Sequence, residues 1–280
     1  MSVTHPSRSA PHPINLHLEF FRRTSVGQAI FKVKDIKLGA RISNVHVTLA
    51  QQDDEGILQD EVEGYITMSN IRKETGLTLP TGFQLHPAPI AADLRTLLAR
   101  GEDQNWGLWR AQAFSKFRRA GKNILMYLEK QDRRPADRSR AILDQWVRFS
   151  PLEKHGKWTN DCLGFVVDMF PQVVETYINA ERGESDLEEK RPDQSNPRPK
   201  YWYPTLALNL DVKKLLPEEG VEWLFVRVLA SVIKNGRIDL HVTVLDEGGD
   251  VVALSTHCSL VLDASRNTTR NNKKRKDSKL

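Results

Sequence analysis

Cysteine and long apolar runs are scarce in this sequence. Among 280 residues there are two cysteines, Cys162 and Cys258. Two are too few for a disulfide framework or a four-cysteine zinc site, and each lies in or beside an apolar segment, so we expect buried, reduced thiols. No run approaches the roughly 18 apolar residues that a membrane helix needs, and residues 1–12 have no apolar core of a secretory signal. These absences predict an intracellular protein with no membrane span.

Several catalytic signatures are also missing. Residues 229–233 read LASVI, so Ser231 is not in a Gly-x-Ser-x-Gly elbow. There is no glycine-rich loop to hold phosphates and no His-x-x-x-His spacing for a metal. We therefore expect no nucleophilic serine, no metal and no cofactor.

The positive charge is confined to the C-terminal tail. The net charge is +5, but residues 264–280 hold seven Lys or Arg and one acid, Asp277. Removing the tail from the 41 basic and 36 acidic residues leaves 34 and 35, a body charge of −1. A nucleic-acid binder spreads positive charge over a folded face, so we expect no nucleic-acid partner.

Hydrophobic periodicity predicts long strands with few helices. The expected strands are 16–22, 29–37, 42–51, a run ending near Met68, 122–129, 142–149, 205–211, 222–233, 237–246 and 251–262. After the strand that ends near Met68, we expect a crossover at 80–89 and a short helix at 91–100, which Gly101 ends. A second helix, capped by Thr159 or Asn160 and running to Phe170, is apolar on nearly every side and should be buried. The acidic and then proline-containing composition of residues 181–200 predicts a mobile loop.

Two stretches of the chain are alike. Residues 39–56 and 236–248 share a glycine, then His-Val-Thr on a strand, then Asp-Glu-Gly in a turn. Agreement of turn, strand and order favours duplication of one unit. That unit is a sheet of long strands around one buried helix.

At this point the sequence resembles the type II acyl-CoA thioesterases and their thioesterase-like relatives. The resemblance rests on segments at 16–23 (LHLEFFRR), 163–171 (LGFVVDMFP), 208–211 (LNLD), 223–225 (WLF) and 249–253 (GDVVA). It implies an α+β double hotdog, in which two antiparallel sheets each wrap a central helix. The expected parts are a disordered N-terminus at 1–15, an incomplete hotdog at 16–105, a second hotdog at 106–263 and a basic tail at 264–280. We expect the first hotdog to lack its central helix, because only a short polar lead-in precedes Leu16; either the chain begins late or the protein is a reduced form of the family.

The resemblance also implies a catalytic set in the second hotdog. It comprises an Asp that matches Asp211, a hydroxyl that falls on Ser231, and a Gln whose position holds His257. The histidine departs from the family pattern, because it replaces a neutral amide with an imidazole that titrates. Backbone N–H groups at the start of the buried helix, at Asn160, Asp161 and Cys162, are the expected oxyanion donors.

Structural readings of the same residues stay open. Asp211 precedes two lysines and fits a solvated carboxylate at a turn. Ser231 fits a packing residue, and His257 on an apolar strand fits a hydrogen-bonded core histidine.

The chain ends in Ser278, Lys279 and Leu280, the peroxisomal import tripeptide. We therefore expect an acyl-CoA hydrolase of fatty-acid and lipid metabolism in the peroxisomal matrix, with acyl-CoA and the import receptor as partners. The basic run 273–276 offers a nuclear signal, so the nucleus is an alternative location, and the cytoplasm is another.

Two alternative functions remain. One is a hotdog enoyl-CoA hydratase or dehydratase. The other is a non-catalytic acyl-binding accessory protein of a secondary-metabolite pathway. The sequence leaves a homo-oligomer open.

Overall fold

The computed structural model describes residues 10–109, 119–151, 154–170, 173–182 and 201–264. The strands are β1 (His12–Phe20), β2 (Ile30–Leu38), β3 (Ser43–Gln52), β4 (Leu58–Ser69), β5 (Trp106–Leu108), β6 (Ile124–Glu129), β7 (Ile142–Phe149), β8 (Tyr201–Trp202), β9 (Thr205–Val212), β10 (Trp223–Leu229), β11 (Ile233–Lys234), β12 (Arg237–Leu245), β13 (Val251–Leu260) and β14 (Leu262–Asp263). The described helices are α1 (Leu94–Arg100), α2 (Leu163–Val166) and α3 (Val173–Arg182), with 3-10 turns η1 (Ile71–Lys73), η2 (Arg119–Asn123) and η4 (Asn160–Cys162). The expected strand-rich α+β architecture is confirmed.

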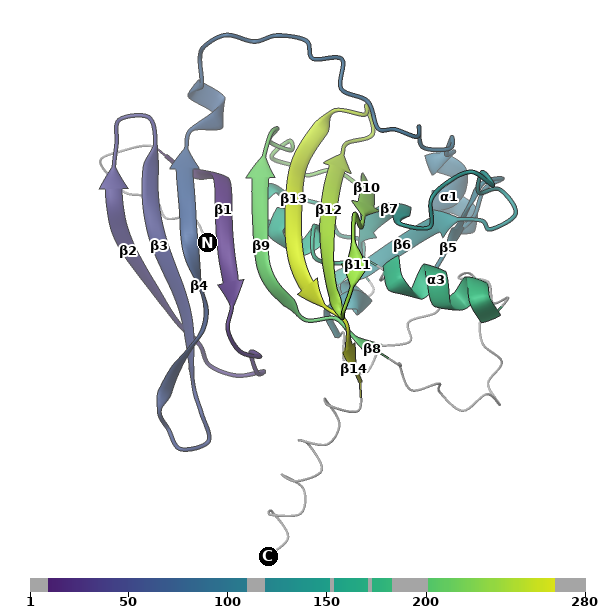
Figure 1. Ribbon diagram of the computed structural model, residues 1–280. Coiled ribbons are helices and arrows are strands. Elements are labelled where there is room, and N and C mark those ends of the chain that lie inside the picture. Colours follow the sequence, from purple (N-terminus) through teal and green to yellow (C-terminus); the bar gives the residue numbers. More distant parts are fainter. Residues whose placement is uncertain (1–9, 110–118, 152–153, 171–172, 183–200, 265–280) are drawn as a thin grey trace, which may run out of the picture.

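One antiparallel sheet of twelve strands runs through the molecule (Figure 1). Its order is β2-β3-β4-β1-β9-β13-β12-β10-β7-β6-β5, with β11 beside β12; β8 and β14 pair separately. The N-terminal strands join the C-terminal ones through β1 and β9, which pair from Asn15↔Asp211 to Glu19↔Ala207. The chain then crosses over the ends of the central strands to reach α1 (Figure 1).

The C-terminal part of the sheet buries both faces. Strand alternation on β10 sends Leu224, Val226 and Val228 into a core that includes the residues of α2, whereas Trp223 and Phe225 pack into a second cluster around Leu97 of α1. The crossover and α1 therefore cover one face, and α2 covers the other.

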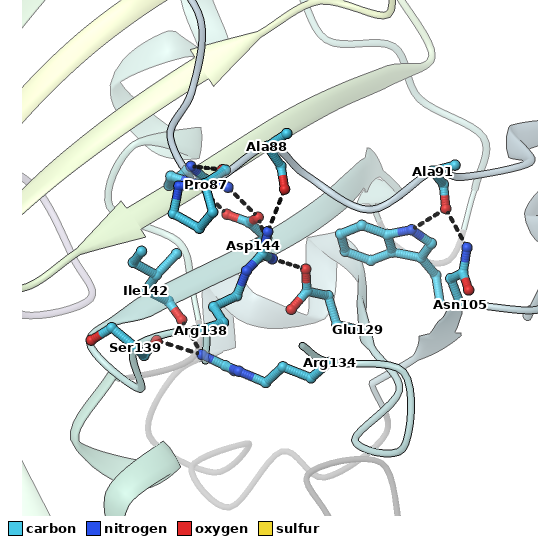
Figure 2. Close-up of polar contacts among 12 residues, drawn as sticks. Pro87, Ala88, Ala91, Asn105, Glu129, Arg134, Arg138, Ser139, Ile142 and Asp144 are labelled. Atoms are coloured by element: carbon cyan, nitrogen blue, oxygen red, sulfur yellow. Dashed lines mark hydrogen bonds and ion pairs between the residues drawn. The ribbon is translucent and has the colours of Figure 1, made fainter. Parts of the chain in front are cut away.

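Buried charges fix the crossover to the sheet (Figure 2). Arg227 forms a bidentate ion pair with Asp144, at 2.6 and 2.7 Å, and donates to the Pro87 carbonyl at 2.7 Å. Arg138 donates to Asp144 at 2.9 Å, to Glu129 and to the Ala88 carbonyl at 2.6 Å. Burial raises the pKa of Glu129. These contacts pair the charges of Arg227, Arg138 and Asp144, which would otherwise be buried at high cost, although Nε of Arg138 has no hydrogen-bond partner among the described residues.

The N-terminal strands are covered much less. Among the described residues before η1 there is no helix, and the buried apolar residues on β1 to β4 are Val45, Ala50 and Met68. On β2 every residue from Ile30 to Lys37 is exposed.

The prediction for the end of the first helix is confirmed, whereas the predicted length of the second helix is wrong. α1 ends at Gly101, which has φ +78°, as predicted. The buried helix is shorter than predicted: η4 leads into the four residues of α2, and the chain continues to Met169 with i→i−3 bonds from Asp168 and Met169. Cys162 and Cys258 are free thiols but half-buried rather than buried.

Within the described residues, no helix is long and apolar enough to cross a membrane. Most of the predicted loop at 181–200 and nearly all of the basic tail, including Ser278, Lys279 and Leu280, lie outside them.

Candidate active site

His257 is a fully buried polar side chain on β13. It pairs with Leu240 of β12 and Leu208 of β9, and both leucines belong to the core packed on α2, so the imidazole faces the buried helix. Its side chain is 0% exposed, and its ring lies 6.0 Å from the Phe170 ring. Burial lowers the pKa of His257 to about 4, so the ring is neutral at pH 7.

Asp168 lies at the end of the buried helix, directly opposite this ring. Its Oδ1 is 3.7 Å from Nδ1 of His257, and its side chain is 49% exposed. The carboxylate therefore connects the buried imidazole with the solvent side of the site.

Thr205 completes the group because of a β-bulge. The pairing of β9 with β13 shifts between Cys258↔Ala207 and Ser259↔Thr205, which leaves Leu206 as the extra residue. Directly paired residues share a face, so the bulge turns Thr205 to the face that holds His257. Thr205 donates from Oγ1 to Asp168 Oδ1 at 3.3 Å.

The three side chains offer complementary chemistry. Asp168 supplies a charged acceptor, Thr205 a hydroxyl, and His257 a neutral ring nitrogen. Nδ1 of His257 has no hydrogen-bond partner among the described residues. A buried ring nitrogen without a partner, beside a carboxylate and a hydroxyl, can hold a water molecule.

The expected residue Asp211 lies on the other side of the sheet. It pairs with Leu254, an odd number of positions along β13 from His257, so the two side chains point to opposite faces. Asp211 accepts from Asn15 at 2.9 Å and lies 3.7 Å from Lys213 Nζ. The side chains of Asp211 and His257 therefore lie on opposite faces of the sheet.

Ser231 is also away from His257. It is exposed, follows β10, and its backbone N–H donates to Asp239 Oδ2 at 3.3 Å. Asp239 pairs with Cys258, on the face that His257 does not share. Of the expected set Asp211, Ser231 and His257, the structure thus places only His257 beside Asp168 and Thr205.

The expected oxyanion donors begin the helical segment, at η4. The N–H of Cys162 already donates to the Thr159 carbonyl at 3.0 Å, and the side chain of Asn160 exchanges two hydrogen bonds with the backbone of Leu216. Asp161 is exposed. From Cys162 to Asp168 is roughly 9 Å at the rise of a regular helix.

Sequence reasoning missed Asp168 and Thr205. Asp168 is the one charged residue in the apolar segment LGFVVDMFP, and that isolation is the usable signal. Thr205 gave no signal, because strict alternation places it on the face of Asp211 and only the bulge moves it.

Solved structures of similar fold include thioesterases. A candidate thioesterase II of Thermobifida fusca superposes with a TM-score of 0.61 at 18% identity, over 91% of this chain and 80% of its own. TesB2, an acyl-CoA thioesterase II of Mycobacterium marinum, superposes with a TM-score of 0.57 at 14% identity, over 93% and 83%. At such identities the likeness shows a shared fold.

The sequence then identifies the family. Residues 93–261 match the acyl-CoA thioesterase C-terminal domain, and residues 1–69 match the N-terminal domain. The thioesterase-like protein TwmA of Talaromyces wortmannii is 35% identical, over 93% of this chain and 80% of TwmA. The chain belongs to the acyl-CoA thioesterase family, which confirms the resemblance found in the sequence.

Proposed function

We propose that this protein hydrolyses acyl-CoA thioesters, with the attacking water held by Asp168, Thr205 and His257. The observation that supports this proposal most is the meeting of a carboxylate, a hydroxyl and a neutral imidazole at the end of the buried helix. Membership of the acyl-CoA thioesterase family indicates the substrate class.

The reaction needs an activated water and a polarised carbonyl. Water attacks the thioester carbon, and one proton passes to Nδ1 of His257 while Asp168, held by the hydroxyl of Thr205, accepts the other hydrogen of the water. The expected donors at Asn160 and Asp161 precede Asp168 by eight and seven residues, roughly 10–12 Å at the rise of a regular helix, so they lie too far away to bind the oxyanion formed at this water. When the C–S bond breaks, the thiolate takes the proton from His257, so the products are a carboxylic acid and free CoA.

Two isosteric variants separate this site from the one expected from the sequence. Asp168→Asn removes the charged acceptor, and we expect kcat to fall by about 10²- to 10⁴-fold. Asp211→Asn is the matched control on the opposite face of the same sheet and should keep wild-type turnover. Release of free thiol from a series of acyl-CoA esters measures both. Loss of activity in Asp211→Asn with retention in Asp168→Asn would reverse the assignment.

A hotdog hydratase or dehydratase is the second candidate, because an acid and a histidine 3.7 Å apart also suit addition of water to an enoyl-CoA. Mass analysis of products decides between them: the hydrolase releases CoA, whereas the hydratase adds water and keeps the thioester. Binding of acyl-CoA with neither product would favour the non-catalytic accessory protein.

We propose the peroxisomal matrix as the location, on the basis of Ser278, Lys279 and Leu280. A fluorescent protein fused to the N-terminus leaves the tripeptide free and should give a peroxisomal pattern. Deleting Leu280 should disperse it, whereas replacing Lys273, Lys274, Arg275 and Lys276 with alanine should not. Nuclear fluorescence that depends on the basic run would contradict the proposal.

We also propose that the fold is a double hotdog whose first unit has no central helix among the described residues. The continuous sheet, joined through β1 and β9, and the exposure of β2 from Ile30 to Lys37 support it. An experimental structure of the full chain with a helix packed on the N-terminal strands would overturn this proposal.

The oligomeric state is a separate question. Sedimentation of the full chain would show whether it forms a homo-oligomer.

A further inference from the structure

Ser255 is a buried hydroxyl beside the candidate active site. It lies two residues before His257 on β13, on the same face, and is 4% exposed. Its Oγ contacts two groups: the carbonyl oxygen of Asn209, on the neighbouring strand β9, and Nε2 of His257 at 3.0 Å.

Only one placement of the protons makes both contacts of Ser255 Oγ hydrogen bonds. A carbonyl oxygen only accepts, so the single hydroxyl proton of Ser255 is donated to Asn209. The contact with His257 is then a hydrogen bond only if Nε2 carries a proton and donates it to Ser255 Oγ. A neutral imidazole has one N–H, so Nδ1 must hold a lone pair.

That lone pair points to the carboxylate. Nδ1 is 3.7 Å from Asp168 Oδ1 and has no hydrogen-bond partner among the described residues. Two acceptors cannot bond to each other directly, but a water molecule can donate one hydrogen to each. From this geometry we infer that Ser255 is a positioning residue, which holds His257 in the Nε2–H tautomer and so keeps Nδ1 as the proton acceptor for the attacking water.

The role of His257 as a base differs from the role that a glutamine side chain would have at the same position of β13. A glutamine side chain orients a water but does not take a proton at neutral pH, whereas an Nε2–H imidazole offers a base, provided that its other nitrogen is fixed. The inference rests on the proposed hydrolase activity for its kinetic consequence, but the tautomer itself is a property of the resting protein.

Nitrogen NMR of protein with ¹⁵N-labelled histidine rings tests the tautomer directly. The His257 signals are identified by their loss in His257→Gln. In the wild type we expect a protonated Nε2 and an unprotonated Nδ1. In Ser255→Ala the Nε2 proton has no acceptor, so the proton should move to Nδ1 and be donated to Asp168.

The same variant gives a kinetic readout. We expect kcat of Ser255→Ala to fall by about 10²-fold or more, which is the contribution of a positioned base, with little change in KM. Ser255→Thr keeps the hydroxyl and should keep the Nε2–H tautomer. Thr256→Ala is the matched control, because Thr256 accepts from the side chain of Asn209 at 3.1 Å on the opposite face of β13. It should leave both readouts unchanged.

The outcomes separate the two proposals. A protonated Nδ1 in an active wild type would overturn the role of Ser255 and leave the hydrolase standing, even if Ser255→Ala does not fold. A wild type with the Nε2–H tautomer but no thioester hydrolysis would overturn the proposed function alone. An unchanged tautomer and kcat in folded Ser255→Ala would also overturn the inference.

Discussion

His257 links the chemistry of the site to the stability of the protein. Its neutral ring is buried against Phe170, and Oδ1 of Asp168, at the end of the helix, lies 3.7 Å from Nδ1. Its paired neighbours Leu208 and Leu240 do not titrate. The low pKa that favours a neutral base at pH 7 is therefore a consequence of desolvation, which also makes protonation costly in the folded state.

This cost predicts a pH dependence of unfolding. The folded pKa of about 4 is below the ordinary 6.5, so the unfolded chain binds a proton first as the pH falls. The stabilisation is complete above pH 6.5 and is lost towards pH 4, by about 3 kcal/mol in total. Urea unfolding of the wild type and of His257→Gln at several pH values measures the difference. Parallel curves for the two proteins would contradict the prediction.

At the scale of elements, β7 and β10 depend on buried ion pairs as well as on apolar packing. Asp144 is held between Arg227 and Arg138, and all three side chains are at most 5% exposed. The same arginines bind the carbonyls of Pro87 and Ala88, so the cluster positions the crossover (Figure 2).

Asp144→Ala should therefore destabilise the fold strongly. It leaves the buried guanidinium of Arg227 without a carboxylate and that of Arg138 with Glu129 alone, which costs about 3–5 kcal/mol. Lys32→Ala removes half of an exposed pair with Asp60, at 3.2 Å, and should change stability by less than about 1 kcal/mol. The free energy of unfolding in urea compares them, and a small effect of Asp144→Ala would show that the cluster relaxes or admits water.

At the scale of the molecule, one sheet joins two parts with unequal burial. β12 buries Ile238, Leu240, Val242 and Val244 on one face, whereas β2 is exposed along nearly its whole length. Backbone hydrogen bonds with little apolar cover open at lower free energy than those within a core.

The rate of hydrogen–deuterium exchange should therefore differ between the N-terminal and C-terminal strands of the sheet. We expect the amides of β2 and β3 to exchange faster than those of β12 and β13, with β1 and β9 between them. Mass spectrometry of peptides from each strand gives the order. Equal protection across the sheet would indicate that something covers the N-terminal strands in solution.

Much of the secondary structure was predictable, because strand periodicity and helix termination are local. The alternation in β12 and the left-handed Gly101 after α1 need only neighbouring residues to be recognised. The length of the buried helix was not predictable in this way, because an apolar run does not show where i→i−4 bonds give way to i→i−3 bonds.

The sequence alone determined the strand-rich fold, the thioesterase resemblance and the choice of His257 as an unusual residue. Only the tertiary structure decided which residues meet it. Asp168 and Thr205 are 37 residues apart and lie together through the end of a helix and a bulge at Leu206. A shift of one residue in strand pairing reverses the face of every side chain beyond it, so the site depends on a register that no local pattern records.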